Sequence, residues 1–194
     1  MSSTTLNYLI VPGWHGSPER HWQSHWQQQL PNAFRVEQDN WQQPQLADWE
    51  NALARKIDEL PGEVILIAHS LGCITVAHWS RMAEAQTLSR IRGALLVAPA
   101  DVERVDCPHE LTGFAPIALE RLPFASLLVG STSDRAASAE RALEFAADWG
   151  ADALILERAG HINIESGHTK WEQGFAFLYQ LQEQHKVQNS QLCA

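Results

Sequence analysis

The chain has 194 residues, of which 45% are hydrophobic, with 14 Lys and Arg against 23 Asp and Glu. A chain of this length can bury about 70% of its unfolded surface in one core, so we expect a single domain over residues 1–194. Within it we expect a core at about 6–180 and a frayed tail at 185–194. The net charge of −9 and the lack of a basic run exclude nucleic acid and anionic membranes as expected partners.

The cysteines and the amino-terminal segment bear on the expected compartment. Cys73, Cys107 and Cys193 have no CxxC spacing, which argues against a disulfide framework or a zinc cluster. The first residues lack the basic and apolar regions of a signal peptide, and no run approaches 18 apolar residues. The expectation is a cytoplasmic protein with no membrane partner.

Short apolar runs along the chain predict strands, and the segments between most of them have helical periodicity. Apolar stripes at helical spacing lie within 46–60, which Pro61 and Gly62 end, within 139–149, which Gly150 ends, and within 171–181. This alternation predicts an α/β fold with a mainly parallel sheet. Residues 99–114 have no clear period, and a loop of that length is usually functional or mobile. The six predicted strands are Tyr8–Val11, Phe34–Val36, Val64–Ala68, Ala94–Ala98, Ser126–Val129 and Ala153–Leu156.

The pentapeptide AHSLG lies between a predicted buried strand and a helical segment, Ile74–Met82. This context matches a nucleophile elbow, a sharp turn that needs small flanking residues and is here bounded by Ala68 and Gly72. On such a turn the Ser70 hydroxyl is exposed beside a helix N-terminus, where developing negative charge is favoured. The alternative is that Ser70 merely caps the helix.

A nucleophilic serine needs a base, and nine histidines are present. His161 is the expected base because it follows the last predicted strand, after Gly160, where reactive side chains gather in parallel sheets. His168 is the second candidate, and His69 is expected to pack or hydrogen-bond near the elbow. We expect solvated or helix-surface positions for His21, His25, His78, His109 and His185, and the His21/His25 spacing is only a weak metal motif.

The orienting acid should lie at another strand end, between the serine and the histidine in chain order. Asp134 follows the fifth predicted strand and is the first choice, whereas Asp101 holds the equivalent place after the fourth strand. Either aspartate would also serve as a helix cap.

Four segments together resemble a known family. VPGWHGSPERHWQSHW, AHSLG, VGSTSD and AGHINIESGHTKW occur in the order of the small serine α/β-hydrolases that include YdeN and retinoblastoma-binding protein nine. The resemblance spans about residues 6–180 and implies a three-layer hydrolase without a cap domain, with strand order 2-1-3-4-5-6. It also implies Ser70, Asp134 and His161 as the catalytic triad. Two residues depart from the family pattern, namely Ala68 in place of glycine and Arg135 where proline is common.

The oxyanion hole is expected from two backbone N–H groups. One belongs to Leu71, which follows the nucleophile, and the other comes from the loop after the first strand, residues 12–16. The resemblance implies that Trp14 supplies this second donor. No phosphate-binding glycine motif is present. The residues expected to contact substrate are Trp14, His15, Trp41 and Phe114.

These expectations define a serine carboxylesterase for small to medium soluble esters, which works through an acyl-enzyme and needs no metal or cofactor. A thioesterase or amidase with the same triad is an alternative. A second alternative is a non-catalytic protein-interaction scaffold on the same fold. The sequence offers no support for a protein partner, because residues 71–75 approximate an L-x-C-x-E string but end in Thr75.

Overall fold

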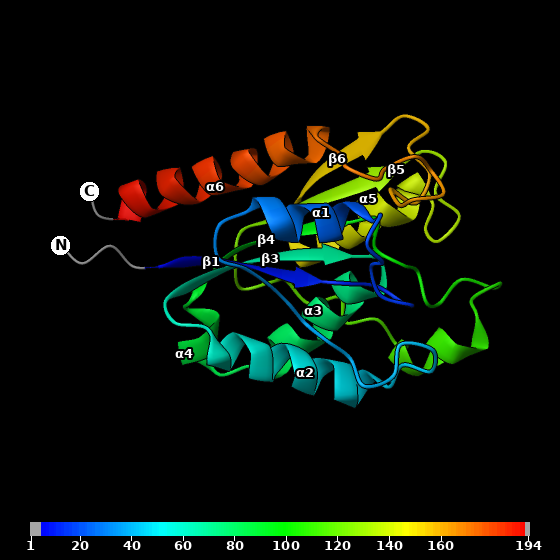
Figure 1. Cartoon of the computed structure of the whole chain (residues 1–194), viewed down its shortest axis with the longest axis horizontal. Helices are drawn as coiled ribbons and strands as arrows, with labels where there is room; N and C mark the ends of the chain where they lie inside the picture. The colour runs from blue at the N-terminus through cyan, green and yellow to red at the C-terminus, as the bar shows by residue number, and fades with distance from the viewer. Residues whose placement is uncertain (1–4, 193–194) are drawn as a thin grey trace.

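A computed structural model of the chain describes residues 5–192, with side chains described to residue 183, and contains one six-stranded parallel sheet (Figure 1). The strand order is β2-β1-β3-β4-β5-β6, which confirms the expected order. Every neighbouring pair is parallel. The strands are β1 Leu6–Val11, β2 Ala33–Arg35, β3 Glu63–His69, β4 Ile91–Val97, β5 Ser126–Ser131 and β6 Asp152–Leu156.

Helices cover both faces of the sheet, so the fold has three layers (Figure 1). Side chains of α1 and α6 pack on one face, and those of α2, α3 and α5 pack on the other. The helical elements are α1 Trp22–Gln29, α2 Leu46–Glu59, α3 Leu71–Met82, α4 Ala85–Leu88, the 3-10 helix η1 His109–Phe114, α5 Ala139–Trp149 and α6 Gln173–Leu192.

The sequence of the central strand β3 does not alternate between apolar and polar residues, because both faces of the strand are buried. Val64, Leu66 and Ala68 enter the core beneath α2 and α3, whereas Ile65 and Ile67 enter the core beneath α1 and α6. A strand buried on both faces needs apolar side chains at every position. The polar residues that follow β3 therefore lie at the carboxyl edge of the sheet.

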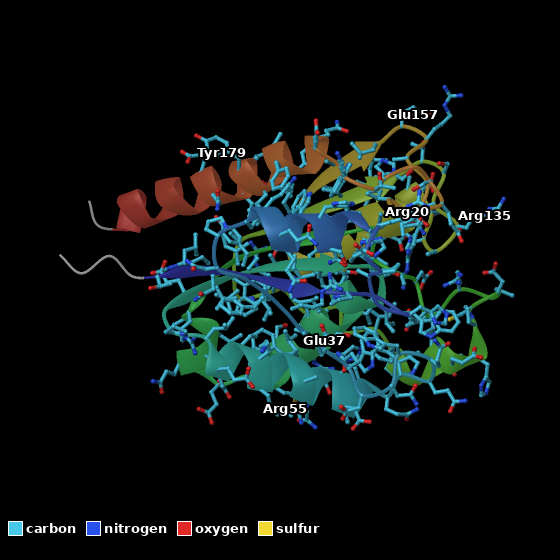
Figure 2. All side chains as sticks on the ribbon, in the orientation of Figure 1. Arg20, Glu37, Arg55, Arg135, Glu157 and Tyr179 are labelled. Carbon is cyan, nitrogen blue, oxygen red and sulfur yellow. The ribbon has the colours of Figure 1, made fainter. Side chains whose placement is uncertain are left out.

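Helix ends agree with local sequence signals. Ser138 caps α5 by accepting a hydrogen bond from Arg141 N at 3.1 Å, and Gly150 ends the helix with φ of 65°. Charged residues on the outer helix faces, such as Arg55 on α2, point away from the sheet (Figure 2). The predicted stop at Gly150 is confirmed.

Three elements, namely α1, the short helix α4 and η1, are absent from the sequence-based prediction. Helix α1 has a glutamine-rich outer face and only two large apolar residues, Trp22 and Trp26, which are both fully buried. The 3-10 helix η1 lies within the segment 99–114 that was expected to be irregular.

At the carboxyl end of the chain, α6 includes residues 185–192, part of the tail expected to fray, and residues 193–194 lie outside the described range. Within residues 5–192, no helix has both the length and the apolar character to span a membrane.

Candidate active site

Ser70 occupies a strained turn between β3 and α3. Its φ and ψ are 56° and −123°, a conformation that L-residues rarely adopt. The turn also brings the next residues against the end of β1, because a Cβ at Gly72 would collide with the carbonyl oxygens of Val11 and Pro12. This strand–serine–helix geometry is that of a nucleophile elbow.

His161 joins Ser70 and Asp134 in one hydrogen-bonded chain. Its Nε2 lies 2.9 Å from Ser70 Oγ, and its Nδ1 lies 2.9 Å from Asp134 Oδ2. In the neutral ring, Nδ1–H donates to the carboxylate and Nε2 accepts the serine hydroxyl. The Asp134 side chain is 2% exposed, so its charge is kept out of water next to the imidazole. This arrangement lets the imidazole remove a proton from Ser70.

The alternative acid and base lie elsewhere in the hydrogen-bond network. Asp101 accepts a hydrogen bond from Glu103 N and forms an ion pair with Arg141. His168 Nδ1 pairs with Ser166 Oγ at 3.0 Å. The structure brings together the three first-choice residues and does not bring these two alternatives into contact with them.

Three consecutive hydroxyls hold the loop of the acid to the loop of the base. Ser131, Thr132 and Ser133 accept hydrogen bonds from the backbone N–H groups of Ala159, Arg158 and Gly160, respectively, over 2.9–3.0 Å. The STS tripeptide before Asp134 therefore fixes the distance between Asp134 and His161. In contrast, the exposed Arg135 points outward into solvent (Figure 2).

The loop after β1 lies directly against the elbow. A Cβ at Gly13 would lie 2.7 Å from Ser70 Cβ and 3.3 Å from Leu71 N, so only glycine allows this approach. Among the described residues, the backbone N–H of Trp14 has no hydrogen-bond acceptor. The N–H groups expected to form the oxyanion hole, those of Leu71 and Trp14, thus belong to two segments that meet at Ser70.

Two further histidines are buried beside His161. His69 Nε2 donates to the carbonyl oxygen of His161 over 2.9 Å, and the ring of His21 packs edge-on against that of His69, with centroids 4.9 Å apart. Burial lowers the pKa of His21 to about 3, and it lowers the pKa of His69 well below its usual value. Both rings are therefore neutral near pH 7.

These positions correct part of the sequence analysis. His21 and His78 were expected at solvated or helix surfaces, but both are buried. His21 Nδ1 caps α1 by accepting from Gln23 N, and His78 Nε2 donates to the carbonyl oxygen of Phe114. A histidine with a backbone partner at a helix end can be buried at little cost, which spacing alone does not reveal. The side chain of His185 lies outside the described range.

Gln23 is a residue of the site that the sequence analysis did not single out. It is fully buried, and its amide donates to the carbonyl oxygens of Val11 at 3.3 Å and Ile67 at 3.0 Å, while its side-chain oxygen accepts from Ser17. Val11 ends β1 and Ile67 lies near the end of β3. Gln23 therefore ties together the two strands that carry the oxyanion loop and the elbow.

The residues expected to contact substrate fall into two groups. Trp14 stacks on the exposed His15 at 4.0 Å, and the carbonyl oxygen of Trp41 accepts a hydrogen bond from His15 N, so these three lie together beside the elbow. Phe114 is different, because it is 0% exposed and packs edge-on against Trp49 in the core. The expectation that Phe114 contacts substrate is not met, since its surface is taken up by core neighbours.

A serine on a strained turn at the carboxyl edge of a three-layer parallel α/β sheet defines a serine hydrolase with the α/β-hydrolase fold. A sequence profile named for serine hydrolases matches residues 8–180. The chain belongs to the serine hydrolase family.

Several solved structures have a similar fold, at different levels of sequence identity. A YdeN-like hydrolase from Pectobacterium atrosepticum is 32% identical, with a TM-score of 0.81 over 93% of this chain and 92% of that one. The ydeN gene product of B. subtilis is 20% identical, with a TM-score of 0.74 over 92% and 98%. A thermophilic esterase from Thermogutta terrifontis shares the fold at 14% identity, with a TM-score of 0.67 over 94% and 91%. The search of curated proteins gave no match.

Proposed function

We propose that the protein is a carboxylesterase that cleaves small to medium soluble esters, with Ser70 as nucleophile, His161 as base and Asp134 as orienting acid. The observation that carries the proposal is the 2.9 Å contact between His161 Nε2 and Ser70 Oγ, because it joins a base to a hydroxyl on a strained elbow.

In the first step, Ser70 Oγ attacks the ester carbonyl carbon while His161 takes the hydroxyl proton. The N–H groups of Leu71 and Trp14 would donate to the oxyanion, and Asp134 would stabilise the imidazolium. The imidazolium then gives its proton to the leaving alkoxide, and an alcohol departs from the acyl-enzyme.

In the second step, water replaces the alcohol. The water oxygen attacks the acyl carbon while His161 takes a proton from the water. His161 then gives this proton to Ser70 Oγ as the bond between Ser70 and the acyl group breaks and the carboxylic acid leaves. The two steps together convert one ester and one water molecule into an alcohol and a carboxylic acid, without any change of oxidation state.

The proposed preference for small to medium esters rests on the segments that surround the elbow. The segment between β4 and β5 contains a single six-residue 3-10 helix, η1, which is too short to form a large lid. Trp14, His15 and Trp41 supply aromatic surface on one side. An open site of this kind suits soluble esters better than long-chain lipids.

The test is labelling of Ser70 by a fluorescent fluorophosphonate together with hydrolysis of p-nitrophenyl esters of increasing chain length. We expect Ser70→Ala to lower kcat by about 10⁵–10⁶ and Asp134→Asn by about 10⁴. Asp101→Asn is the matched control, because it alters the rejected acid, and it should stay within a few-fold of wild type.

Near-normal turnover in a folded Ser70→Ala variant would disprove the mechanism. Labelled Ser70 with turnover of thioesters or amides but not of esters would replace the substrate class and keep the triad. Folded wild-type protein without labelling or turnover would favour the binding-scaffold alternative.

A further inference from the structure

Strand β6 is one edge of the sheet, and within the described residues only β5 pairs with it. Thr132 N donates to the carbonyl oxygen of Leu156 over 3.0 Å, so Leu156 turns its backbone groups toward β5. In a parallel ladder the N–H and C=O of one residue point to the same side and alternate residues point to opposite sides. The backbone groups of Ala153 and Ile155 therefore point out of the sheet, where they can hydrogen-bond a further strand.

The edge at β6 also lacks the features that usually protect a sheet edge, which are shortness, charge and proline. At the other edge, β2 has only three residues, and the side chain of Arg35 extends from it to Ser17 and Ser24. In contrast, β6 has five residues, and four of them, 153–156, are the apolar run ALIL. Of the two edges, β6 is the one suited to accept another strand.

Apolar side chains lie on both faces of this edge. Leu154 and Leu156 are half-buried at the margin of the core beneath α6. On the other face, α5 packs against β5 and β6, and its Leu143 is 49% exposed. Arg141 of α5 pairs with Asp101, which follows β4, and Leu143 lies about 200° further around the helix, on the side of β6. A strand added at β6 would cover this apolar surface.

The sequence around β6 is complementary to itself in the antiparallel direction. A two-fold axis through Ile155 places this residue opposite its own copy, so that the outward N–H and C=O groups of the two residues face each other. The same axis places Asp152 opposite Arg158, twice. Both residues are exposed, and Arg158 takes part in no ion pair among the described side chains. An axis through Leu154 would instead place Asp152 opposite Leu156, so charge favours the axis through Ile155.

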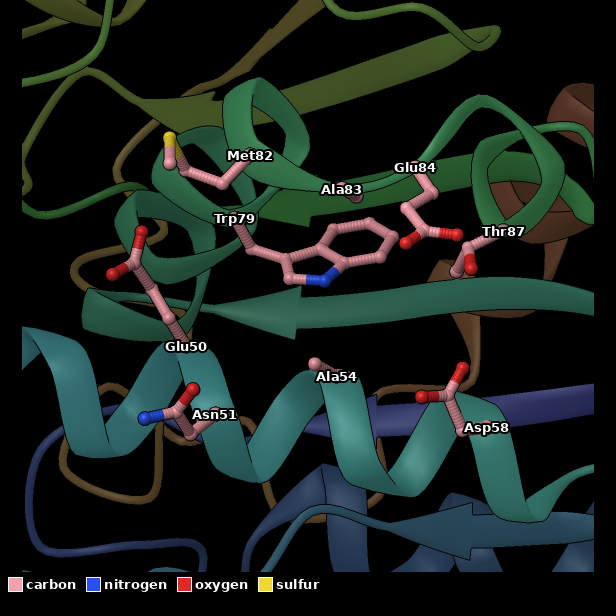
Figure 3. A pocket seen from close by; sticks show the side chains of 9 residues that line it. All are labelled: Glu50, Asn51, Ala54, Asp58, Trp79, Met82, Ala83, Glu84 and Thr87. Atoms are coloured by element: carbon pink, nitrogen blue, oxygen red, sulfur yellow. The ribbon is translucent and has the colours of Figure 1, made fainter.

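The opposite flank of the molecule, formed by α2 and the end of α3, lacks this balance of charge (Figure 1). A hollow of about 460 Å³ there is lined by Glu50, Asp58 and Glu84 and by no basic residue (Figure 3). Met82 is exposed beside it, but a second copy bound at this flank would bring carboxylates together. In a chain of net charge −9, association at β6 is therefore favoured over association at α2.

We propose that the protein forms a homodimer in which two β6 strands pair in the antiparallel direction and join the two sheets into one. The N–H of Ile155 donates to the carbonyl oxygen of Ile155 in the second copy, and the reciprocal bond forms as well. Asp152 of each copy pairs with Arg158 of the other. The strand is short, so we expect a dissociation constant on the order of 10–100 µM. The interface is independent of the proposed esterase activity.

The first test is sedimentation equilibrium of the full chain at about 0.15 M salt over a range of concentrations. We expect the mass to rise from 21.7 kDa toward twice that value. Ala153→Pro removes an outward N–H without removing a bond between β5 and β6, and it should keep the protein monomeric. Ala153→Thr retains the N–H and is the matched control, which should dimerise within a few-fold of wild type. Thermal unfolding verifies that each variant is folded.

Charge exchange tests the register. Arg158→Asp places two acidic residues opposite each other at both ends of the interface and should weaken dimerisation about tenfold. Asp152→Arg/Arg158→Asp exchanges the two charges and should restore the dimer to within about threefold of wild type.

A wild-type mass that stays at 21.7 kDa up to about 500 µM would overturn the proposal. A dimer that persists in folded Ala153→Pro would place the contact elsewhere, and a folded charge-exchange variant that stays as weak as Arg158→Asp would exclude the axis through Ile155. Either result would also overturn the proposal.

Discussion

His69 donates a hydrogen bond from Nε2 to the carbonyl oxygen of His161, over 2.9 Å. A carbonyl oxygen only accepts, so this contact sets the tautomer of the His69 ring and leaves Nδ1 unprotonated. The residue before the nucleophile thereby holds the backbone of the proposed base. The elbow and the His161 loop are coupled through this bond as well as through the Ser70 hydroxyl.

We therefore expect His69→Leu to lower kcat for ester hydrolysis about tenfold with little change in KM, because a misplaced base slows chemistry more than binding. His69→Gln, whose amide can donate from a similar position, should recover most of the loss. Steady-state kinetics on variants with verified thermal unfolding would check this. Equal kcat in wild type and a folded Leu variant would show that the bond does not position His161.

Gln23 gives a second positioning prediction. Gln23→Leu leaves the buried carbonyl oxygens of Val11 and Ile67 without this donor, and we expect a loss of about 1–3 kcal/mol in the free energy of unfolding. We also expect a fall in kcat and in affinity for a boronic acid that mimics the tetrahedral intermediate, at nearly constant KM. The exposed Gln28 on the same helix provides the control, Gln28→Leu. If boronate affinity stayed constant, Gln23 would be a purely structural residue.

The backbone of Ser70 predicts a conflict between stability and activity. A non-glycine residue at φ of 56° and ψ of −123° carries strain of about 1–3 kcal/mol, which glycine does not share. After allowance for the greater flexibility of glycine in the unfolded chain, Ser70→Gly should be more stable than Ser70→Ala by about 1 kcal/mol. Both variants lack the hydroxyl and should be inactive. Urea unfolding of the pair measures the difference, and an alanine variant as stable as glycine would argue against strain.

The strands and the elbow could be predicted because each has a local signal in the sequence, whereas the strand order was implied only by the resemblance to the small serine α/β-hydrolases. Buried parallel strands are continuous apolar runs, and AHSLG combines a strand end, a serine and small neighbours. Chain order and the rule that reactive groups gather at strand ends favoured His161 and left Asp134 and Asp101 as candidate acids, and the family resemblance added support for Asp134. That rule works here because both loops lie at the same edge of one sheet.

The buried support of the site could not be predicted in the same way. Gln23 lies on the short helix α1 and His21 caps it, and this helix turns some polar residues inward and others outward, so its sequence lacks the amphipathic stripe that marks α2 and α5. Their partners, Val11, Ile67 and His69, are distant in the chain or are backbone atoms. Hydrogen bonds from side chains to backbone atoms that are distant in the chain produce no periodic pattern in the sequence.

Phe114 is the opposite case, a residue that the sequence analysis assigned to the substrate site but that the structure places in the core. The sequence placed it on an irregular segment near the site, but η1 turns its ring into the core against Trp49. We expect Phe114→Ala to cost about 3–5 kcal/mol of unfolding free energy through the cavity it leaves. The ratio of kcat/KM for short and longer acyl chains should stay unchanged. A large shift in this ratio in a stable variant would return Phe114 to the substrate site.

The lowered pKa values of His21 and His69 predict acid sensitivity. Between about pH 6.5, where an unfolded histidine gains its proton, and the value of about 3 for folded His21, the unfolded chain binds more protons than the folded one. We therefore expect these two histidines to lower the unfolding free energy as pH falls below about 6.5, by at most about 2.7 kcal/mol per pH unit. His21→Asn keeps a helix-capping oxygen and removes one titrating ring, so the slope between pH 6 and pH 5 should drop by about half of this amount. Denaturant titrations of wild type and His21→Asn at several pH values measure both slopes, and identical slopes would mean that His21 is protonated in the folded protein.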